Sequence, residues 1–295
     1  MAVTKQTDVF SREQPITHQD ARRREGFYQF LILLSLFTLL LLTLVPIILM
    51  IFLSLKDNGQ IYGRFWGLPN PVRWENYPAG YQAMAHYITN SLTYSSLSVA
   101  GVVFLASLTG YVFARHRFPF KEVIYLAILS LLMIPGVLTL IPSFVLVQQL
   151  GLLNTPWALI LPWTAGGQVF GILLCRTFFA NLPQELFDSG KIDGATEFQL
   201  YYKIAVPLSW PIIVTVAIMH LVATYNDFIW PLLTITNSSM QVVSVGLTQF
   251  TSEFGITDWG PRMAAYSVAT IPLLLLFMFG MRYYIRGITS GAVKA

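Results

Sequence analysis

The chain has 295 residues, of which 55% are hydrophobic and only 11% charged, and its mean hydropathy is +0.61. Soluble domains carry roughly 25% charged residues, so these charges are too few to cover a water-facing surface. The basic residues behind the net charge of +4 do not cluster on one soluble face, which excludes nucleic acid as a partner. The chain has one cysteine, which excludes a disulfide scaffold as a fold.

The chain is expected to be an all-α integral membrane protein in a lipid bilayer, with six transmembrane helices. About 20 apolar residues cross a hydrocarbon core about 30 Å thick. A polar N-terminal tail is expected over residues 1–26, and the first transmembrane helix over 27–55. An external segment then covers 56–86, a core with five further transmembrane helices covers 87–285, and a C-terminal tail covers 286–295.

The five spans of the core follow from its apolar stretches. The second span is expected over 87–114. The uncharged stretch between 122 and 176 is too long for one span, and the turn signal at 151–156 divides it into two. The fifth span is expected to start near residue 204 or 208 and to run to about 233, and the sixth covers 263–281.

The positions of the basic residues predict the orientation. Most of the 18 Lys and Arg residues lie in the two tails and in the loops after the second and fourth spans. Cytoplasmic loops carry an excess of these residues, so both termini are expected in the cytoplasm. Arg64 and Arg73 lie on the external side, where they could favour an acidic sugar.

The segment between the fourth and fifth spans, here called the 176–207 loop, is longer than a connection requires. A first short helix is expected to start at Pro183, with Glu185 in its first turn, and to end at Asp193-Gly194. Thr196-Glu197-Phe198-Gln199 predicts a capping box that opens a second short helix, which Pro207 is expected to stop.

The second short helix is expected to be amphipathic. Four apolar residues recur at helical spacing, and one face of them could seat in a partner's groove. These residues are Phe198, Tyr201, Tyr202 and Ala205.

The stretch LPQELFDSGKIDGATEFQLYYKIAVPLSWP resembles the cytoplasmic signature loop of ATP-binding-cassette importer permeases. It is most similar to the oligosaccharide subfamily, in particular the maltose-type second permease subunit. Gly194, Ile204 and Pro207 fall at the spacings of that motif. The usual Glu-Ala-Ala positions hold Asp188-Ser189-Gly190, where glycine weakens a helix by about 1 kcal/mol relative to alanine.

Two further stretches support the resemblance. The run Asn226-Asp227-Phe228-Ile229-Trp230-Pro231 is similar to the wording of the sugar subfamily at the end of its fifth span. Residues 286–295 resemble a tail that reaches into the ATPase dimer in maltose-type permeases.

The resemblance implies a type I importer permease fold with a cytoplasmic coupling helix. It implies a bacterial inner-membrane subunit that forms half of a pore with a homologous permease. An external solute-binding protein would deliver an oligosaccharide, and a cytoplasmic ATPase dimer would bind ATP and Mg. This chain would be neither an enzyme nor a cofactor-binding subunit, consistent with its lack of a G-x-x-x-x-G-K-[ST] motif.

The resemblance also assigns residues. Those expected to dock the ATPase are Glu185, Asp188, Ser189, Gly190, Asp193, Gly194, Ala195, Thr196, Phe198, Ile204 and Pro207. The tail contact would involve Gly291, Ala292, Val293 and Lys294. The substrate path would include Tyr225, Asn226, Asp227 and Trp230.

Other interpretations stay open at this point. The same machinery could carry another solute, such as a sugar phosphate or a peptide, and a self-sufficient secondary transporter is a more distant alternative. Asp227, near the external end of its span, could be a hydrated or locally paired group without a role in transport. Gly166, Gly167 and Gly171 are expected to serve helix packing, and no metal site is predicted.

Overall fold

A computed structural model describes residues 18–249 and 257–292, with side chains described over 27–248 and 257–281. The chain divides into two compact units, Met1–Met50 and Ile51–Ala295. The described part of the first unit belongs to helix α1 (His18–Ser54), which carries Pro46. The side chains over 27–50 are apolar on all sides and largely exposed, as expected for a helix surrounded by lipid.

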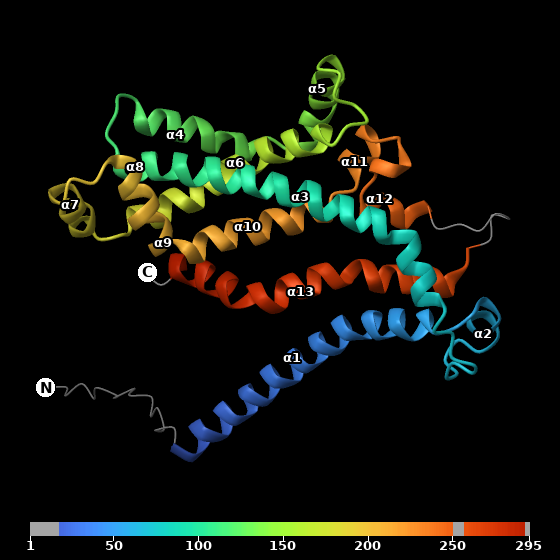
Figure 1. Cartoon of the computed structure of the whole chain (residues 1–295). Helices are drawn as coiled ribbons and strands as arrows, with labels where there is room; N and C mark the ends of the chain where they lie inside the picture. The colour runs from blue at the N-terminus through green and yellow to red at the C-terminus, as the bar shows by residue number, and fades with distance from the viewer. Residues whose placement is uncertain (1–17, 250–256, 293–295) are drawn as a thin grey trace, which may run out of the picture. The chain divides into compact units, whose positions relative to one another are not determined.

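The second unit contains the remaining helices. In chain order they are α2 (Asn58–Gly63), α3 (Asn76–Arg115), α4 (Lys121–Ser130), η1 (Leu131–Met133), α5 (Gly136–Gln149), α6 (Trp157–Ala180), α7 (Gln184–Ile192), α8 (Glu197–Leu200), the π-helix η2 (Tyr201–Ala205), α9 (Val206–Leu208), α10 (Trp210–Tyr225), α11 (Ile229–Thr234), η3 (Ser238–Met240), α12 (Val243–Gly246), η4 (Leu247–Gln249) and α13 (Trp259–Ala292). Helices α3, α6, α10 and α13 run side by side, with α7 and α8 at one end and α5, α11 and α12 at the other (Figure 1).

Four of the described helices are long and apolar enough to cross a membrane without a break. They are Phe27–Ser54, Asn76–Arg115, Trp157–Ala180 and Trp259–Met281. Two further pairs pass the same test together but are sharply bent. Lys121–Met133 meets Gly136–Gln149 at 100°, and Glu197–Leu208 meets Trp210–Tyr225 at 77°. The number of spans is therefore four, or six when each bent pair counts as one.

Helix α3 begins at Asn76, well ahead of the apolar stretch that begins at residue 87. Asn76 is buried, and its side-chain amide donates to the backbone oxygens of Ser54 and Lys56 at 2.8 and 2.9 Å. A hydropathy pattern does not report this extension, because its first turn is held by polar contacts to the end of α1 and to Lys56.

The fifth span, expected to run to about residue 233, is broken near its end: α10 ends at Tyr225 and α11 begins at Ile229. Pro231 has no N–H with which to continue the hydrogen-bond ladder to the oxygen of Asp227. Instead, the hydroxyl of Ser244 donates to that oxygen at 2.6 Å. The break is thus compensated by a side chain from α12.

Helices α3 and α6 approach each other closely at glycines. A Cβ atom at Gly110 of α3 would lie 2.6 Å from the Cβ of Cys175 on α6. A Cβ at Gly171 of α6 would lie 2.7 Å from the Cβ of Ala106, and one at Gly167 would meet His220 at 2.7 Å. The packing role expected for Gly167 and Gly171 is therefore confirmed. A Cβ atom at Gly166, by contrast, would meet no atom within 4 Å.

A charged cluster holds the segment between α1 and α3. Asp57 caps α2 by accepting the Gln60 N–H at 2.9 Å, and Arg73 donates to Asp57 at 2.9 Å. The Gln60 amide and the Arg73 side chain lower the pKa of Asp57. Arg73 also pairs with Glu75 at 3.2 Å, so its charge is shared by two carboxylates of its own segment.

Gly110→Val should lower the free energy of unfolding by about 1–3 kcal/mol, because the added atoms overpack the crossing of α3 and α6. The matched control is Gly63→Val, since a Cβ at Gly63 meets nothing within 4 Å. Thermal unfolding of the detergent-purified variants measures both. Equal midpoints for the two variants would contradict the close crossing.

Candidate functional site

The 176–207 loop contains two short helices joined by a tight glycine turn. Gly194 adopts a positive φ of 78° directly after α7. Its N–H donates to Lys191 O at 3.0 Å, and the Ala195 N–H donates to Gly190 O at 2.9 Å. These two bonds form a Schellman motif, which favours glycine at the left-handed position.

The predicted capping box at the start of α8 is confirmed. The Gln199 N–H donates to Thr196 Oγ1 at 3.3 Å, and the Thr196 N–H donates to Gln199 Oε1 at 2.8 Å. Glu185 lies in the first turn of α7 as predicted, where a negative charge faces the positive end of the helix dipole.

The expectation that Pro207 stops the second short helix is wrong. The chain passes from α8 into the π-helix Tyr201–Ala205 and then into α9, which includes Pro207, before it bends at Ser209. In a π turn the N–H bonds five residues back, as Val206 N–H does with Tyr201 O. This wider π turn changes the backbone hydrogen-bond pattern immediately before Pro207, which has no N–H to donate.

The predicted apolar face of the second helix is only partly available to a partner. Tyr201 and Ala205 are buried inside the chain, whereas Phe198 and Tyr202 are each 64% exposed. All four residues lie three or four positions apart along one side of the helix, so the buried pair forms its inner edge and the exposed pair its outer edge. Only the Phe198 and Tyr202 edge is open to a partner.

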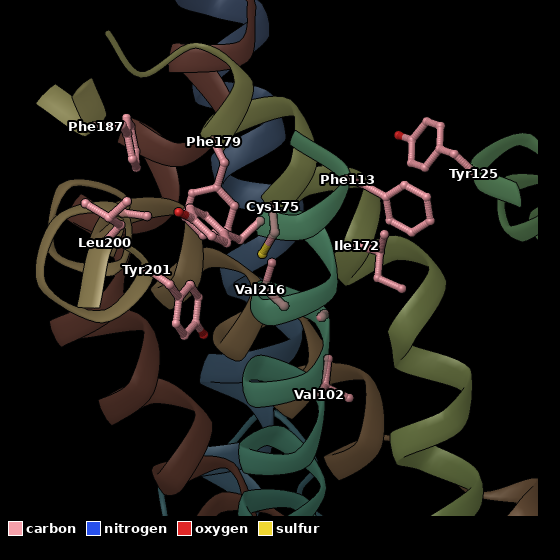
Figure 2. Packing of buried hydrophobic residues seen from close by; sticks show 13 residues of the cluster. Val102, Phe113, Tyr125, Ile172, Cys175, Phe179, Phe187, Leu200, Tyr201 and Val216 are labelled. Atoms are coloured by element: carbon pink, nitrogen blue, oxygen red, sulfur yellow. The ribbon is translucent and has the colours of Figure 1, made fainter. Parts of the chain in front are cut away.

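The buried side of the loop belongs to the main hydrophobic core of the second unit. This cluster joins residues of α3, α6 and α10 to Phe187, Leu200, Tyr201 and Ala205 of the loop. Figure 2 shows Phe187, Leu200 and Tyr201 gathered near Phe179 of α6. The loop is therefore packed into the helix bundle and is not a free linker.

Tyr111 of α3 lies at the centre of this contact. Its ring centroid is 5.3 Å from that of Tyr201, 6.0 Å from Phe179 and 6.2 Å from Phe187. Ser107, one turn earlier on α3, hydrogen-bonds to the Tyr201 hydroxyl at 2.7 Å. Aromatic contacts and one buried hydrogen bond thus hold both halves of the loop against α3.

Arg115, at the end of α3, binds the loop at several points. Its Nη2 donates to the backbone oxygens of Phe179 and Leu182 at 2.6 Å each. Its Nη1 donates to Gln184 Oε1 at 2.9 Å, and the guanidinium lies 4.1 Å from the ring centre of Phe187. Sequence reasoning counted Arg115 only as an orientation signal and missed this role.

The residues predicted to dock the ATPase divide into two groups. The exposed group comprises Glu185, Asp188, Ser189, Asp193, Gly194, Thr196, Phe198 and Pro207. Gly190, Ala195 and Ile204 are half-buried. A Cβ at Gly190 would lie 2.6 Å from Leu200 Cδ2, so the glycine that weakens α7 also lets it approach α8.

The predicted tail contact falls at the edge of the described structure. Gly291 and Ala292 are the last residues of α13, which continues past residue 286. Their side chains, and all of Val293 and Lys294, lie outside the described residues.

At the opposite end of α6, the indole Nε1 of Trp163 donates to Asp227 Oδ2 at 2.7 Å. Two hollows lie around this pair and share Pro162, Trp163 and Asp227 in their linings. One has a volume of about 480 Å³ and extends to α5, and the other has about 380 Å³ and extends to His220 of α10. Sequence reasoning missed Trp163 and His220, which lie among apolar residues without a motif.

The four residues predicted for the substrate path differ in their surroundings. Asp227 lines both hollows. Trp230 lines the larger one, but it is buried and its Nε1 donates to Ala158 O at 2.9 Å. Tyr225 is buried and its hydroxyl donates to Ala269 O at 2.8 Å, so it is part of the packed interior. Asn226 is exposed, and its side-chain amide donates to Val222 O at 2.8 Å.

Within the part of the chain that the structure describes, no group of three or more His, Cys, Asp or Glu side chains is placed to hold a metal ion. The polar contacts at the smaller hollow are of another kind. The ring Nε2 of His220 lies 2.8 Å from Ser98 Oγ, which also accepts from Thr164 Oγ1 at 3.3 Å.

The long apolar helices and the two bent pairs are those of a multi-pass membrane protein, with the 176–207 loop packed against its helix bundle. Residues 103–290 match the family described as binding-protein-dependent transport system inner membrane component, and the chain belongs to this family. The resemblance read from the sequence is thereby confirmed. Its members are non-catalytic membrane subunits of ATP-binding-cassette (ABC) transporters.

Several relatives extend this assignment. The probable ABC transporter permease protein YurM of Bacillus subtilis is 32% identical over 100% of both chains. The trehalose/maltose transport system permease protein MalG of Thermococcus litoralis is 29% identical over 92% of this chain and 99% of its own length. The crystal structure of a bacterial ABC transporter that imports the acidic polysaccharide alginate contains a similarly folded chain, with a TM-score of 0.77 and 19% identity over 94% of this chain and 100% of that one.

Arg115→Gln should loosen the 176–207 loop, because the shorter neutral side chain cannot reach both backbone oxygens. Hydrogen exchange of the α7 amides is expected to rise about tenfold, which corresponds to the loss of charge-assisted hydrogen bonds. The matched control is Arg117→Gln, since Arg117 is exposed two residues further on. Equal protection of α7 in both variants would show that Arg115 does not hold the loop.

Proposed function

We propose that this chain is the permease subunit of an ATP-driven, binding-protein-dependent importer for an oligosaccharide. It would form half of the pore together with a homologous permease subunit. A cytoplasmic ATPase dimer, which binds ATP and Mg, would drive transport, and an external solute-binding protein would deliver the sugar.

The family relatives support an oligosaccharide as the solute. The arabinooligosaccharides transport system permease protein AraQ of Halalkalibacterium halodurans is 32% identical over 70% of this chain and 72% of its own length. The diacetylchitobiose uptake system permease protein NgcG of Streptomyces coelicolor is 28% identical over 86% of this chain and 85% of its own. These names favour a sugar over a peptide or sugar phosphate.

The coupling role is supported by the difference between the two sides of the 176–207 loop. One side is packed into the core with α3 and α6. The other side exposes large apolar side chains: Ile192 is 86% exposed, and Phe198 and Tyr202 are each 64% exposed. An exposed apolar patch on a rigid support is typical of a protein-binding surface.

In this proposal the loop works as a lever. Closure of the ATPase dimer would draw the loops of the two permease subunits together. Because Phe187 and Tyr201 share a core with α3 and α6, the movement would pass to those helices as a rigid body and open the pore to the other side.

The orientation follows from the same assignment. The 176–207 loop would face the cytoplasm of a bacterial cell, with the chain in the inner membrane and both termini on the cytoplasmic side. The excess of Lys and Arg in the tails and in the loops on this side supports that orientation.

Ile192→Asp and Phe198→Asp should each weaken capture of the ATPase subunit by about tenfold or more, because a charge replaces an apolar anchor of the interface. The matched control is Leu68→Asp, which changes an equally exposed leucine in the external segment. Co-purification of the ATPase with the tagged, membrane-inserted chain measures the effect. Undiminished capture by both loop variants would contradict the assigned surface.

A second readout separates the importer from a secondary transporter. The purified chain in liposomes, without its partners and without ATP, is expected to move no sugar. Uptake by the chain alone would contradict the proposed function.

A further inference from the structure

The two hollows beside Trp163 and Asp227 have a common chemical character. Their shared edge carries a carboxylate, and the rest of their lining is apolar or neutral. The lining residues are Gly136, Val137, Thr139, Leu140, Ser143, Pro162, Trp163, Gly166, Gly167, His220, Ala223, Thr224, Asp227, Ile229 and Trp230. Within this described set, Asp227 is the only Asp or Glu, and the set has no Lys or Arg.

The Asp227 carboxylate is held by a hydrogen bond and keeps part of its hydrogen-bonding capacity for a ligand. Its Oδ2 receives the Trp163 N–H at 2.7 Å, and Trp163 itself is only 8% exposed. Two carboxylate oxygens offer about four acceptor sites, so one bond from an indole leaves capacity for further donors. Asp227 is half-exposed, which leaves the carboxylate accessible from the hollows that it lines.

We infer that these hollows bind a neutral oligosaccharide, with Asp227 accepting hydrogen bonds from sugar hydroxyl groups and Trp163 acting as the positioning residue for that carboxylate. Val137 and Ile229 are exposed apolar side chains in the larger hollow, where they match the C–H faces of sugar rings. Gly166 leaves open space in the smaller one. This inference rests on the proposed function.

The same charge excludes acidic sugars. A uronate would bring a second negative charge beside Asp227 in a setting without a lysine or arginine to offset it, and such like-charge contacts are strongly unfavourable. Arg64 and Arg73 could have favoured an acidic sugar, but neither lines the hollows, and Arg73 is paired with Asp57 and Glu75. The fold shared with a chain of an alginate importer therefore does not imply an acidic sugar for this chain.

The test uses the complete importer in proteoliposomes, with both permeases, the ATPase and saturating, sugar-loaded binding protein. The probes are labelled arabinotriose, maltotriose and diacetylchitobiose as neutral sugars, and an alginate trisaccharide as the uronate. The unmodified importer is expected to take up at least one neutral sugar and not the uronate.

The variants are Asp227→Ala, Asp227→Asn and Trp163→Phe. Asp227→Ala should lower sugar uptake per ATP hydrolysed by about tenfold or more, the loss expected for hydrogen bonds to a charged group. Asp227→Asn, which keeps the shape and one acceptor, and Trp163→Phe, which removes only the N–H donor, should each fall between Asp227→Ala and the unmodified importer. Stimulation of the ATPase by the binding protein should stay unchanged in these variants. Because a misfolded pore would lose this stimulation, the measurement separates a lost sugar contact from misfolding.

The matched control is Asp258→Asn, since Asp258 is exposed and lines neither hollow. If Asp227→Ala does not assemble with its partners, Asp227→Asn decides the outcome. Unchanged uptake in the assembled Asp227 variants, or uptake of the uronate by the unmodified importer, overturns the inference while the proposed function stands. Absence of ATP-dependent uptake of every probe overturns the proposed function and, with it, the inference.

Discussion

The close crossing of α3 and α6 is the contact on which the rest of the second unit depends. Helices in lipid gain no hydrophobic driving force from contacting each other, so they associate through van der Waals packing and hydrogen bonds at short distance. Gly110 and Gly171 allow that distance, because a Cβ at either would meet the facing helix at 2.6–2.7 Å. The crossing also sets the register that brings Arg115 to the end of α6.

Helix α6 connects the two functional regions in one rigid element. Its 24 residues correspond to about 36 Å of helix. Trp163 near its start holds Asp227, and Phe179 near its end lies in the cluster that packs the 176–207 loop. In our account, the ATPase acts on one end of this helix and the sugar contacts the other. No separate signalling path is needed between them.

Local sequence rules predicted the parts of the loop that depend on a few neighbouring residues. The capping box at Thr196 and the turn at Gly194 follow from hydrogen bonds within three to five positions, and both are present. The family motif predicted the fold class because its spacing is specific. The residues and spacing of single motifs therefore predicted more of the fold than the hydropathy pattern, which predicted only a membrane protein.

The errors arose where distant residues decide the structure. The sequence did not predict that part of the apolar face of the second helix is buried, because Tyr201 turns towards Ser107 and Tyr111 of α3 and no local pattern reports these contacts. Pro207 fails to stop the helix because a π turn precedes it. The break after Tyr225 is compensated by Ser244 of another helix. Likewise, Arg115 and Trp163 acquire their roles from partners more than 60 residues away.

The most direct test of this account is whether the 176–207 loop moves as one body with the helix bundle. Spin labels at Thr177→Cys on α6 and Ser189→Cys on α7 occupy exposed positions, whereas the native Cys175 is buried and poorly reactive. In the assembled importer, addition of ATP should leave the Thr177–Ser189 distance unchanged. It should shorten the distance from Ser189 to the corresponding loop of the partner permease. A change within the chain as large as the change between the subunits would contradict the account.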